Sequence, residues 1–174
     1  MTDMLAKLYA SKAAASAADE AREPFDLVRE RAVNRAAERR PLRAALTAAD
    51  RPKLPSGADM AALPSTGMIL ALRTPSEAKL PSAPERAPKE GTFAGFTSFK
   101  SAPKAGIYTI SLSAGAWVDV VQDGHVLKPK GFSGATDCAG IRKTMKYELA
   151  AAPFVLQISG AKEDSISIAI LPSE

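Results

Sequence analysis

Apolar and polar residues alternate with a period of two through most of the chain beyond residue 91. This alternation is typical of strands that bury one face and expose the other. Gly, Pro, Asp and Ser residues separate the alternating segments, and Gly106 and Gly160 are expected in turns. The pattern predicts a mainly β fold, an antiparallel, jelly-roll-like β-sandwich over residues 91–174. The apolar positions are Tyr108, Ile110 and Leu112; Val118 and Val120; Ile141, Met145, Tyr147 and Leu149; Phe154, Leu156 and Ile158; and Ile166, Ile168 and Ile170.

A hairpin is predicted at Asp123-Gly124. The run over residues 118–121, rich in β-branched side chains, precedes this dipeptide, and the apolar pair Val126-Leu127 follows it. Asp-Gly between two such runs favours a two-residue type I′ turn, because that turn needs positive φ at both central positions. The turn would set the register of two neighbouring strands.

Residues 1–50 follow a helical pattern instead. Residues 3–22 contain no Gly or Pro and are rich in Ala, Leu, Lys and Glu, which favour helix. A second helix is predicted from Pro24, which suits the first position of a helix, to about Arg40. Pro41 is expected to end or kink that helix, with a further short helical piece after it. Residues 1–50 are therefore predicted to form a helical extension.

Prolines dominate the segment between the helices and the sandwich. Eight occur from Pro41 to Pro88, and this density forbids long helices and favours extended chain. The one strongly apolar run, residues 68–72, predicts a strand near residues 67–73 that joins the sandwich. The rest of residues 51–90 is expected to wrap the sandwich or to link it to the helices.

Composition and charge narrow the function classes only a little. The 174 residues have a formal charge of +4, one cysteine and one histidine. These counts exclude an internal disulfide, a zinc site built mainly from thiolates and any metal centre that needs two imidazoles. The second helix would carry a basic ridge, which is interpreted as a solvated face or as a docking strip for an acidic partner. Nucleic acid is disfavoured because no aromatic residues are interleaved with the ridge. The ridge consists of Arg31, Arg35, Arg39 and Arg43.

Candidate ligand-binding residues occur between positions 117 and 142. Trp117 lies in the strand phase opposite Val118, so it is expected on an outer face, either covered by the proline-rich wrap or open as a stacking platform for a sugar or a peptide. Oxygen ligands from Asp119, Asp123 and Asp137 offer a calcium site as an alternative. No cofactor and no metal centre is expected.

The segment Gly131–Gly140 is predicted to be a structural loop. It lacks the Gly-Lys-Ser/Thr ending of a P-loop and the last glycine of a nucleophile elbow. His125 is interpreted as a turn residue rather than a general base. Cys138 is interpreted as a small buried residue, or as a thiol whose pKa Arg142 and Lys143 lower. The candidate ligand-binding residues are Trp117, Asp119, Asp123, His125, Phe132, Asp137, Cys138 and Arg142.

The opening residues do not resemble a signal peptide. Lys7 and Lys12 divide the apolar positions, and Asp3 stands where a signal peptide has positive charge. No stretch approaches the 18 to 20 or so apolar residues that span a bilayer. A soluble, cytoplasmic protein without a transmembrane segment is expected.

A resemblance to known proteins rests on five segments of the chain. These segments are Glu77–Pro81, Pro84–Gly95, Gly115–Gly124, Cys138–Lys143 and Leu156–Gly160. Over residues 67–172 the chain is similar to small bacterial proteins that are single β-sandwiches of the pre-peptidase C-terminal kind, some of which are labelled homogentisate 1,2-dioxygenase. The resemblance implies a β-sandwich and, because such proteins are usually exported, a periplasmic location as the alternative. The dioxygenase label is not supported, because a mononuclear iron centre typically uses two histidines and a carboxylate, and this chain has one histidine.

These observations favour a non-catalytic binding or interaction module. The first expectation is an accessory subunit whose N-terminal helices dock on a protein partner or on a second copy. The alternative is a carbohydrate- or peptide-binding β-sandwich that uses Trp117. An enzyme that acts through His125 or Cys138 is the third hypothesis.

Overall fold

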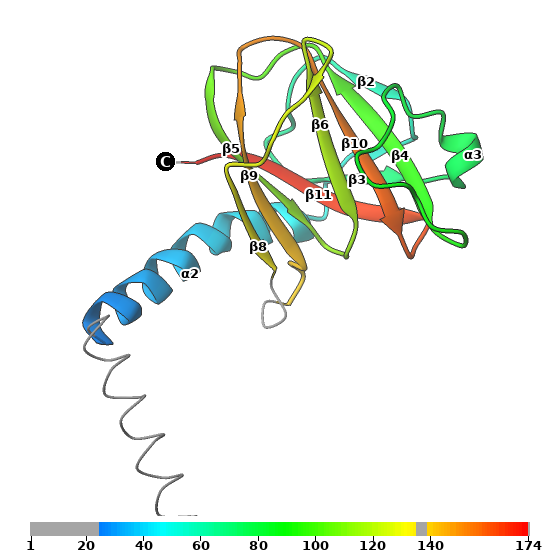
Figure 1. Ribbon diagram of the computed structural model, residues 1–174. Coiled ribbons are helices and arrows are strands. Elements are labelled where there is room, and N and C mark those ends of the chain that lie inside the picture. Colours follow the sequence, from blue (N-terminus) through cyan, green and yellow to red (C-terminus); the bar gives the residue numbers. More distant parts are fainter. Residues whose placement is uncertain (1–24, 135–138, 174) are drawn as a thin grey trace, which may run out of the picture. The chain divides into compact units, whose positions relative to one another are not determined.

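The computed structural model describes residues 25–134 and 139–173, and it confirms the predicted mainly β fold (Figure 1). The strands are β1 (Lys53–Leu54), β2 (Ala58–Met60), β3 (Met68–Ala71), β4 (Phe93–Phe99), β5 (Gly106–Leu112), β6 (Trp117–Gln122), β7 (His125–Val126), β8 (Gly131–Gly134), β9 (Lys143–Leu149), β10 (Phe154–Ala161) and β11 (Ser165–Pro172). The helices are α2 (Phe25–Thr47) and α3 (Pro75–Ala78). The helix predicted over residues 3–22 lies outside the described residues.

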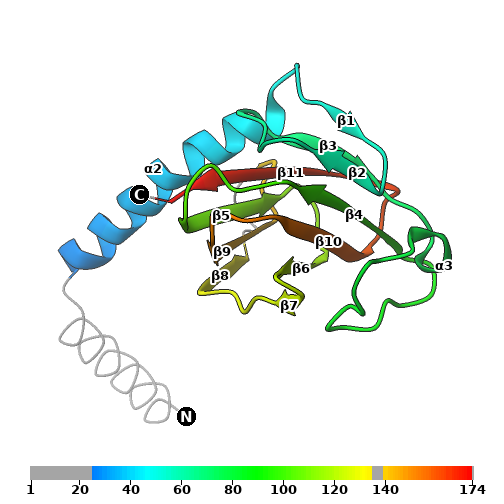
Figure 2. The same ribbon diagram turned by 90° about the horizontal axis from the view of Figure 1, so that it is seen from above.

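Two packed sheets form a sandwich-like arrangement. The six-stranded sheet has the order β1-β3-β11-β5-β9-β8, and the five-stranded sheet has the order β2-β4-β10-β6-β7. All neighbouring strands are antiparallel except the pairs β1–β3 and β2–β4. The chain passes from one sheet to the other at every connection between successive strands except β6–β7 and β8–β9, which ties the two layers together (Figure 2).

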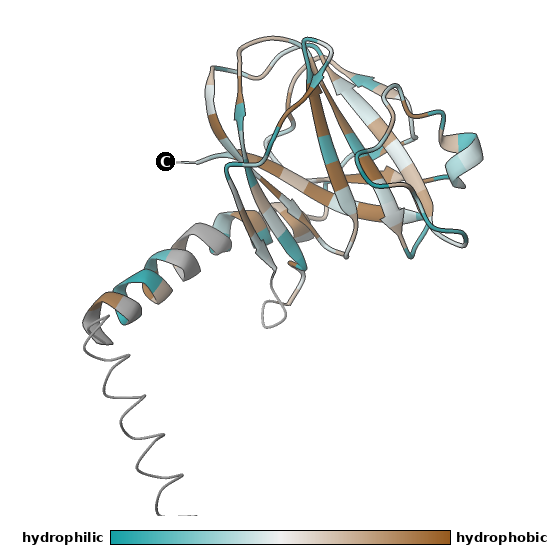
Figure 3. Cartoon of the chain, in the orientation of Figure 1, coloured by the Kyte–Doolittle hydropathy of each residue, from teal (hydrophilic) through white to brown (hydrophobic). Residues whose placement is uncertain are grey.

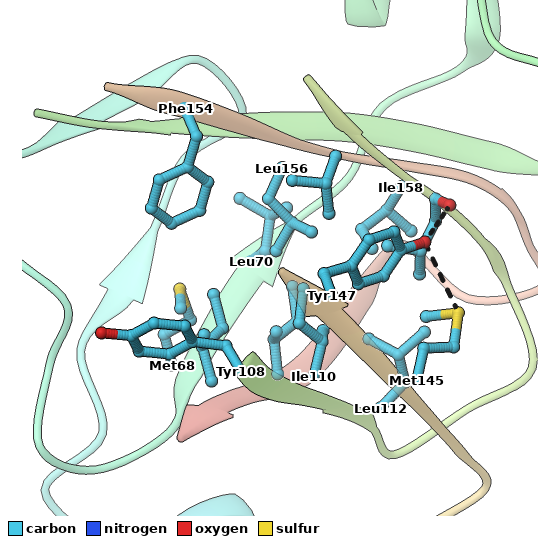
Figure 4. Close-up of a cluster of buried hydrophobic side chains, with 14 of the residues drawn as sticks. Met68, Leu70, Tyr108, Ile110, Leu112, Met145, Tyr147, Phe154, Leu156 and Ile158 are labelled. Atoms are coloured by element: carbon cyan, nitrogen blue, oxygen red, sulfur yellow. Dashed lines mark hydrogen bonds between the residues drawn. The ribbon is translucent and has the colours of Figure 1, made fainter. Parts of the chain in front are cut away.

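The predicted alternation places one face of each of the longer strands β5, β6, β9, β10 and β11 in the core. Apolar positions alternate with polar ones along the strands, as Figure 3 shows, and the buried members fill the space between the sheets. Leu156 and Ile158 from β10 face Ile110 and Leu112 from β5 (Figure 4). Each such side chain contributes about 1.5–3 kcal/mol when fully buried. The phases predicted for β5, β6, β10 and β11 are therefore confirmed.

Ile141 departs from its predicted phase. It precedes β9 and belongs to a second, smaller cluster rather than to the core that Met145, Tyr147 and Leu149 enter. In this second cluster the last turns of α2 pack against the six-stranded sheet, with Leu42, Ala45, Leu46, Ile141 and Ala169 buried. A strand phase cannot be extended past the strand's first residue, because the backbone there is no longer pleated.

Of the two outcomes predicted for Pro41, an end or a kink of the helix, the end is wrong, because α2 continues through this residue to Thr47. The helical piece predicted after Pro41 is present as the last part of α2. A proline inside a helix removes one hydrogen bond and costs about 3 kcal/mol. The next turns offset that cost by burying Leu42 and Leu46 in the second cluster. The chain nevertheless divides here into two compact units, residues 1–40 and residues 41–174. The last turns of α2 thus belong to the sandwich unit.

The hairpin at Asp123-Gly124 is confirmed. Both residues have positive φ, +53° and +76°, as a type I′ turn requires, and Gln122 pairs with His125 across it. Gly160, however, is not in a turn. It lies within β10 at φ +68°, where the register with β4 shifts between Ile158 and Ala161. Glycine tolerates positive φ, so it marks a β-bulge at this position.

The proline-rich segment contributes strands to both sheets. The strand predicted near residues 67–73 is present as β3, and the short strands β1 and β2 add one edge to each sheet. Residues 80–92, called the strap below, then cross the outer face of the five-stranded sheet. Ser82 pairs there with the buried Gln157: its N–H donates to Oε1 (2.8 Å), and its carbonyl accepts from Nε2 (3.3 Å). Neither helix in the described residues is long and apolar enough to cross a membrane.

Candidate functional site

An open groove of about 480 Å³ lies between the strap and one end of the sandwich. Aromatic rings and basic side chains line it, and we call it the basic-aromatic groove. The strap contributes one side, and the beginnings of β6 and β9, the bulge of β10 and strand β8 contribute the rest. Its main side chains are Arg86, Lys89, Trp117, Phe132, Lys143 and Lys162.

Trp117 is half-buried on the outer face of the five-stranded sheet, as its strand phase predicts. Its ring is neither fully covered by the strap nor fully open to solvent. Arg86 of the strap lies over the ring, with Cζ 5.9 Å from its centroid, while the ring still lines the groove. The Nζ of Lys143 lies 5.1 Å from the same centroid. Two cations therefore lie beside one indole ring. This arrangement is favourable because the π electrons give the face of a neutral aromatic ring a partial negative charge.

Asp119 links Trp117 to the strap through hydrogen bonds. Its side chain is only 2% exposed, and both carboxylate oxygens accept hydrogen bonds. Trp117 Nε1 donates to Oδ1 (2.9 Å), and the Glu85 backbone N–H donates to Oδ2 (3.3 Å). Burial raises the pKa of Asp119, while these hydrogen bonds and the nearby Lys143 partly oppose the rise. One carboxylate thus orients the indole and anchors the strap.

Lys143 is the cation most enclosed by the groove. Its Nζ donates a hydrogen bond to the Ala116 carbonyl (2.8 Å) and lies 5.4 Å from the centroid of the Phe132 ring. Burial lowers the pKa of Lys143, Asp119 opposes that change, and Arg86 adds to it. The ammonium group is therefore fixed in place between two aromatic rings.

Phe132 forms the exposed side of the groove. The structural loop predicted over residues 131–140 is wrong at its start, because residues 131–134 form β8 and pair with β9. The Phe132 side chain is 66% exposed, although it is large and apolar. An exposed aromatic ring beside a groove is a common feature of ligand-binding surfaces.

Two further candidates, His125 and Asp123, do not line this groove. His125 and Asp123 are exposed at the hairpin, at the far end of β6 from Trp117. Asp137 and Cys138 lie outside the described residues. The described part of the chain contains no group of three His, Cys, Asp or Glu side chains that could hold a metal, so the calcium alternative has no geometric support there.

The other basic candidates are Arg142 and the basic ridge on α2. Arg142 is exposed, and its backbone N–H donates to the Leu112 carbonyl, while the neighbouring Lys143 occupies the groove. Within the basic ridge, Arg31 and Arg43 are exposed, and the side chains of Arg35 and Arg39 are outside the described set.

Sequence reasoning missed the strap cations. Arg86 and Lys89 stand among prolines, where no periodicity marks a face, and Lys162 follows the bulge in β10. No local signal marks these cations, because residues 105–127 around Trp117 contain no lysine or arginine and only folding brings the strap beside this segment.

No protein-family model matches this chain. A comparison with curated proteins likewise finds no match.

Proposed function

We propose that this protein is a non-catalytic binding module that takes a carbohydrate in the basic-aromatic groove. The observation that carries the proposal is the open groove in which Trp117 and Phe132 present aromatic surface on strands of two different sheets. A pyranose ring has an apolar C–H face and polar edges. Aromatic rings with nearby hydrogen-bond donors match both parts of such a ring.

The rigidity of the groove supports binding. Trp117 is fixed by Asp119, the strap is fixed by Ser82 and Glu85, and Lys143 is fixed by the Ala116 carbonyl. A pre-organised site loses little conformational entropy when a ligand binds. We assign no reaction to the groove. The buried carboxylate beside it, that of Asp119, already accepts a hydrogen bond from an N–H group at each oxygen, so neither oxygen is directed to a ligand.

The single tryptophan makes the proposal directly testable. A panel of neutral and charged oligosaccharides is titrated into the full chain while Trp117 fluorescence is followed. At least one should give a saturable change. Phe132→Ala should weaken that binding roughly three- to tenfold, because one stacking surface is lost.

Val126→Ala is the matched control, since Val126 is another exposed large apolar side chain, on β7, outside the groove. It should bind like the wild type. A silent signal across the panel, or equal binding by Phe132→Ala, would contradict a carbohydrate site here.

Docking through the N-terminal helices is the second candidate function. Residues 1–40 form a compact unit of their own, and its described part exposes two large apolar side chains, Leu27 and Val33. Such residues on a helix surface suit a protein partner. A pull-down with the full chain and with a chain lacking residues 1–40 tests this role: a partner retained by both chains would contradict it.

A further inference from the structure

In the described part of the chain, no acidic side chain forms an ion pair with a cation of the basic-aromatic groove. Among the residues that the structure describes, neither Arg86 nor Lys143 forms an ion pair. Lys89 and Lys162 add two more positive charges, and no acidic residue is among the side chains that line the groove. Four like charges around one groove repel one another, so an anion bound between them would be stabilised.

Two carboxylates beside Trp117 leave the charge of the groove lining positive. Asp119 lies at the Nε1 edge of the Trp117 ring, its two oxygens accept hydrogen bonds from the Trp117 and Glu85 N–H groups, and its charge acts on Lys143. Glu85 is exposed on the strap, and its negative charge acts on Asp119 and Tyr147. Neither residue lines the groove, so the described side chains that do line it carry an excess of positive charge.

The geometry of two of these cations suits one acidic group. Arg86 Cζ lies 5.9 Å and Lys143 Nζ lies 5.1 Å from the centroid of the Trp117 ring, so both charged ends lie beside one ring, and their charges act on each other. A guanidinium presents paired N–H donors that match a carboxylate, and an ammonium adds a point charge. A sugar ring that packs beside the indole would place an acidic substituent within reach of both groups.

From this arrangement we infer that the ligand is an acidic carbohydrate whose carboxylate is held by Arg86 and Lys143. The inference rests on the proposed function, since it names the class of carbohydrate that the same groove takes. It adds a specificity that aromatic surface alone would not give, because stacking does not distinguish acidic from neutral sugars.

Calorimetric titration with a matched pair of sugars tests the inference. Trigalacturonate and its fully methyl-esterified form have the same rings and differ in charge. The acid should bind the full chain about tenfold or more tightly than the ester. Its affinity should fall as sodium chloride rises from about 20 to about 200 mM, whereas the affinity of the ester should stay constant.

Charge-removing variants locate the effect. Arg86→Gln and Lys143→Gln should each lower the ratio of acid to ester affinity about five- to tenfold, because one of the two charges that hold the carboxylate is lost. A change in the shape of the groove would weaken binding of both sugars together and leave this ratio unchanged. Lys53→Gln, on the exposed edge strand β1, removes the same charge away from the groove and should bind both sugars like the wild type.

The possible failures are distinguishable. Equal affinity for acid and ester would overturn the inference and leave the carbohydrate site standing. Absence of binding by both sugars, with no other oligosaccharide of the panel bound, would overturn the proposed function as well. Binding of a tetraglutamate peptide without binding of either sugar would show an anion site for peptides and reject the carbohydrate.

Discussion

Asp119 shows how much one residue can decide. It is an acidic residue in a strand of alternating pattern, and its phase alone would place it on a solvated face. The strap covers that face, so the carboxylate is buried and accepts hydrogen bonds from the Trp117 indole and the strap backbone. A buried carboxylate with two neutral donors positions both neighbours, which explains why the groove has a defined shape.

Tyr147 gives a residue-scale prediction. Its hydroxyl donates to the Val118 carbonyl (3.2 Å) across the core, as Figure 4 shows. Burial, with the negative charges of Asp119 and Glu85, raises the pKa of Tyr147 from 10.0 to about 12. Below pH 10.0 the hydroxyl stays protonated in both states, so its contribution to stability is fully present. As the pH rises toward about 12 the unfolded chain ionises first, and that contribution is lost.

Tyr147→Phe should therefore lower the free energy of unfolding by about 1 kcal/mol at pH 7, through the lost hydrogen bond. The difference from the wild type should shrink as the pH rises from 10.0 toward about 12. Urea denaturation at neutral and alkaline pH measures both quantities. Tyr108→Phe is the control at pH 7, because it also removes one tyrosine hydroxyl and its hydrogen bond, here to the Lys104 carbonyl (2.9 Å). It shows how much stability the loss of such a bond costs elsewhere in the core. A difference that stays constant with pH would contradict the assignment.

At the scale of elements, α2 combines two roles in one helix. Its residues up to Arg40 belong to the first compact unit, and those from Pro41 belong to the sandwich unit. Gly67 illustrates how tightly the second part packs. A Cβ at this position would lie 2.6 Å from the Ala45 carbonyl oxygen and 2.9 Å from that of Ile168. Only glycine allows this approach of the backbones.

Truncation at the two sides of this boundary should have different results. A chain that begins at Pro41 should keep the fold of the sandwich, because it retains the second cluster. A chain that begins at Arg51 lacks Leu42, Ala45 and Leu46, and it should lose several kcal/mol of stability, since each large apolar residue removed from a core costs about 2–5 kcal/mol. Thermal unfolding followed by circular dichroism compares them. Equal melting temperatures would show that the second cluster adds nothing.

At the scale of the whole molecule, one core joins both sheets. Residues of β10 in the five-stranded sheet pack against residues of β5 and β3 in the other, and Phe154 stacks on Phe99 with 4.8 Å between ring centroids. The strap, the groove and the second cluster all depend on strands that enter this core. We therefore expect the sandwich unit to unfold in one cooperative transition.

Leu156→Ala tests this unity. Leu156 is fully buried between the sheets, so the substitution should lower the free energy of unfolding by about 2–5 kcal/mol. Val126→Ala, at an exposed position, should change it by less than about 0.5 kcal/mol. Trp117 fluorescence reports the groove, and far-ultraviolet circular dichroism reports the strands. The two urea transitions should coincide in both variants, and separate midpoints would contradict a single cooperative unit.

The alternation of apolar and polar residues by itself determined the buried faces of the strands in which it is regular. A strand's exposed and buried faces depend only on its own residues, so β5, β6, β10 and β11 could be predicted with correct phases. The Asp123-Gly124 turn was determined equally locally, because two residues suffice to specify a type I′ turn. Trp117 could also be placed on an outer face from its phase alone.

Tertiary structure decided everything that depends on contacts between distant segments. The continuation of α2 through Pro41, the place of Ile141 and the bulge at Gly160 follow from packing partners that no local pattern names. The groove has the same origin: Arg86 in the strap and Lys143 on β9 meet at Trp117 on β6 only after both sheets form. Because strand pairing is non-local, the sequence predicted the parts of this site and folding determined their assembly.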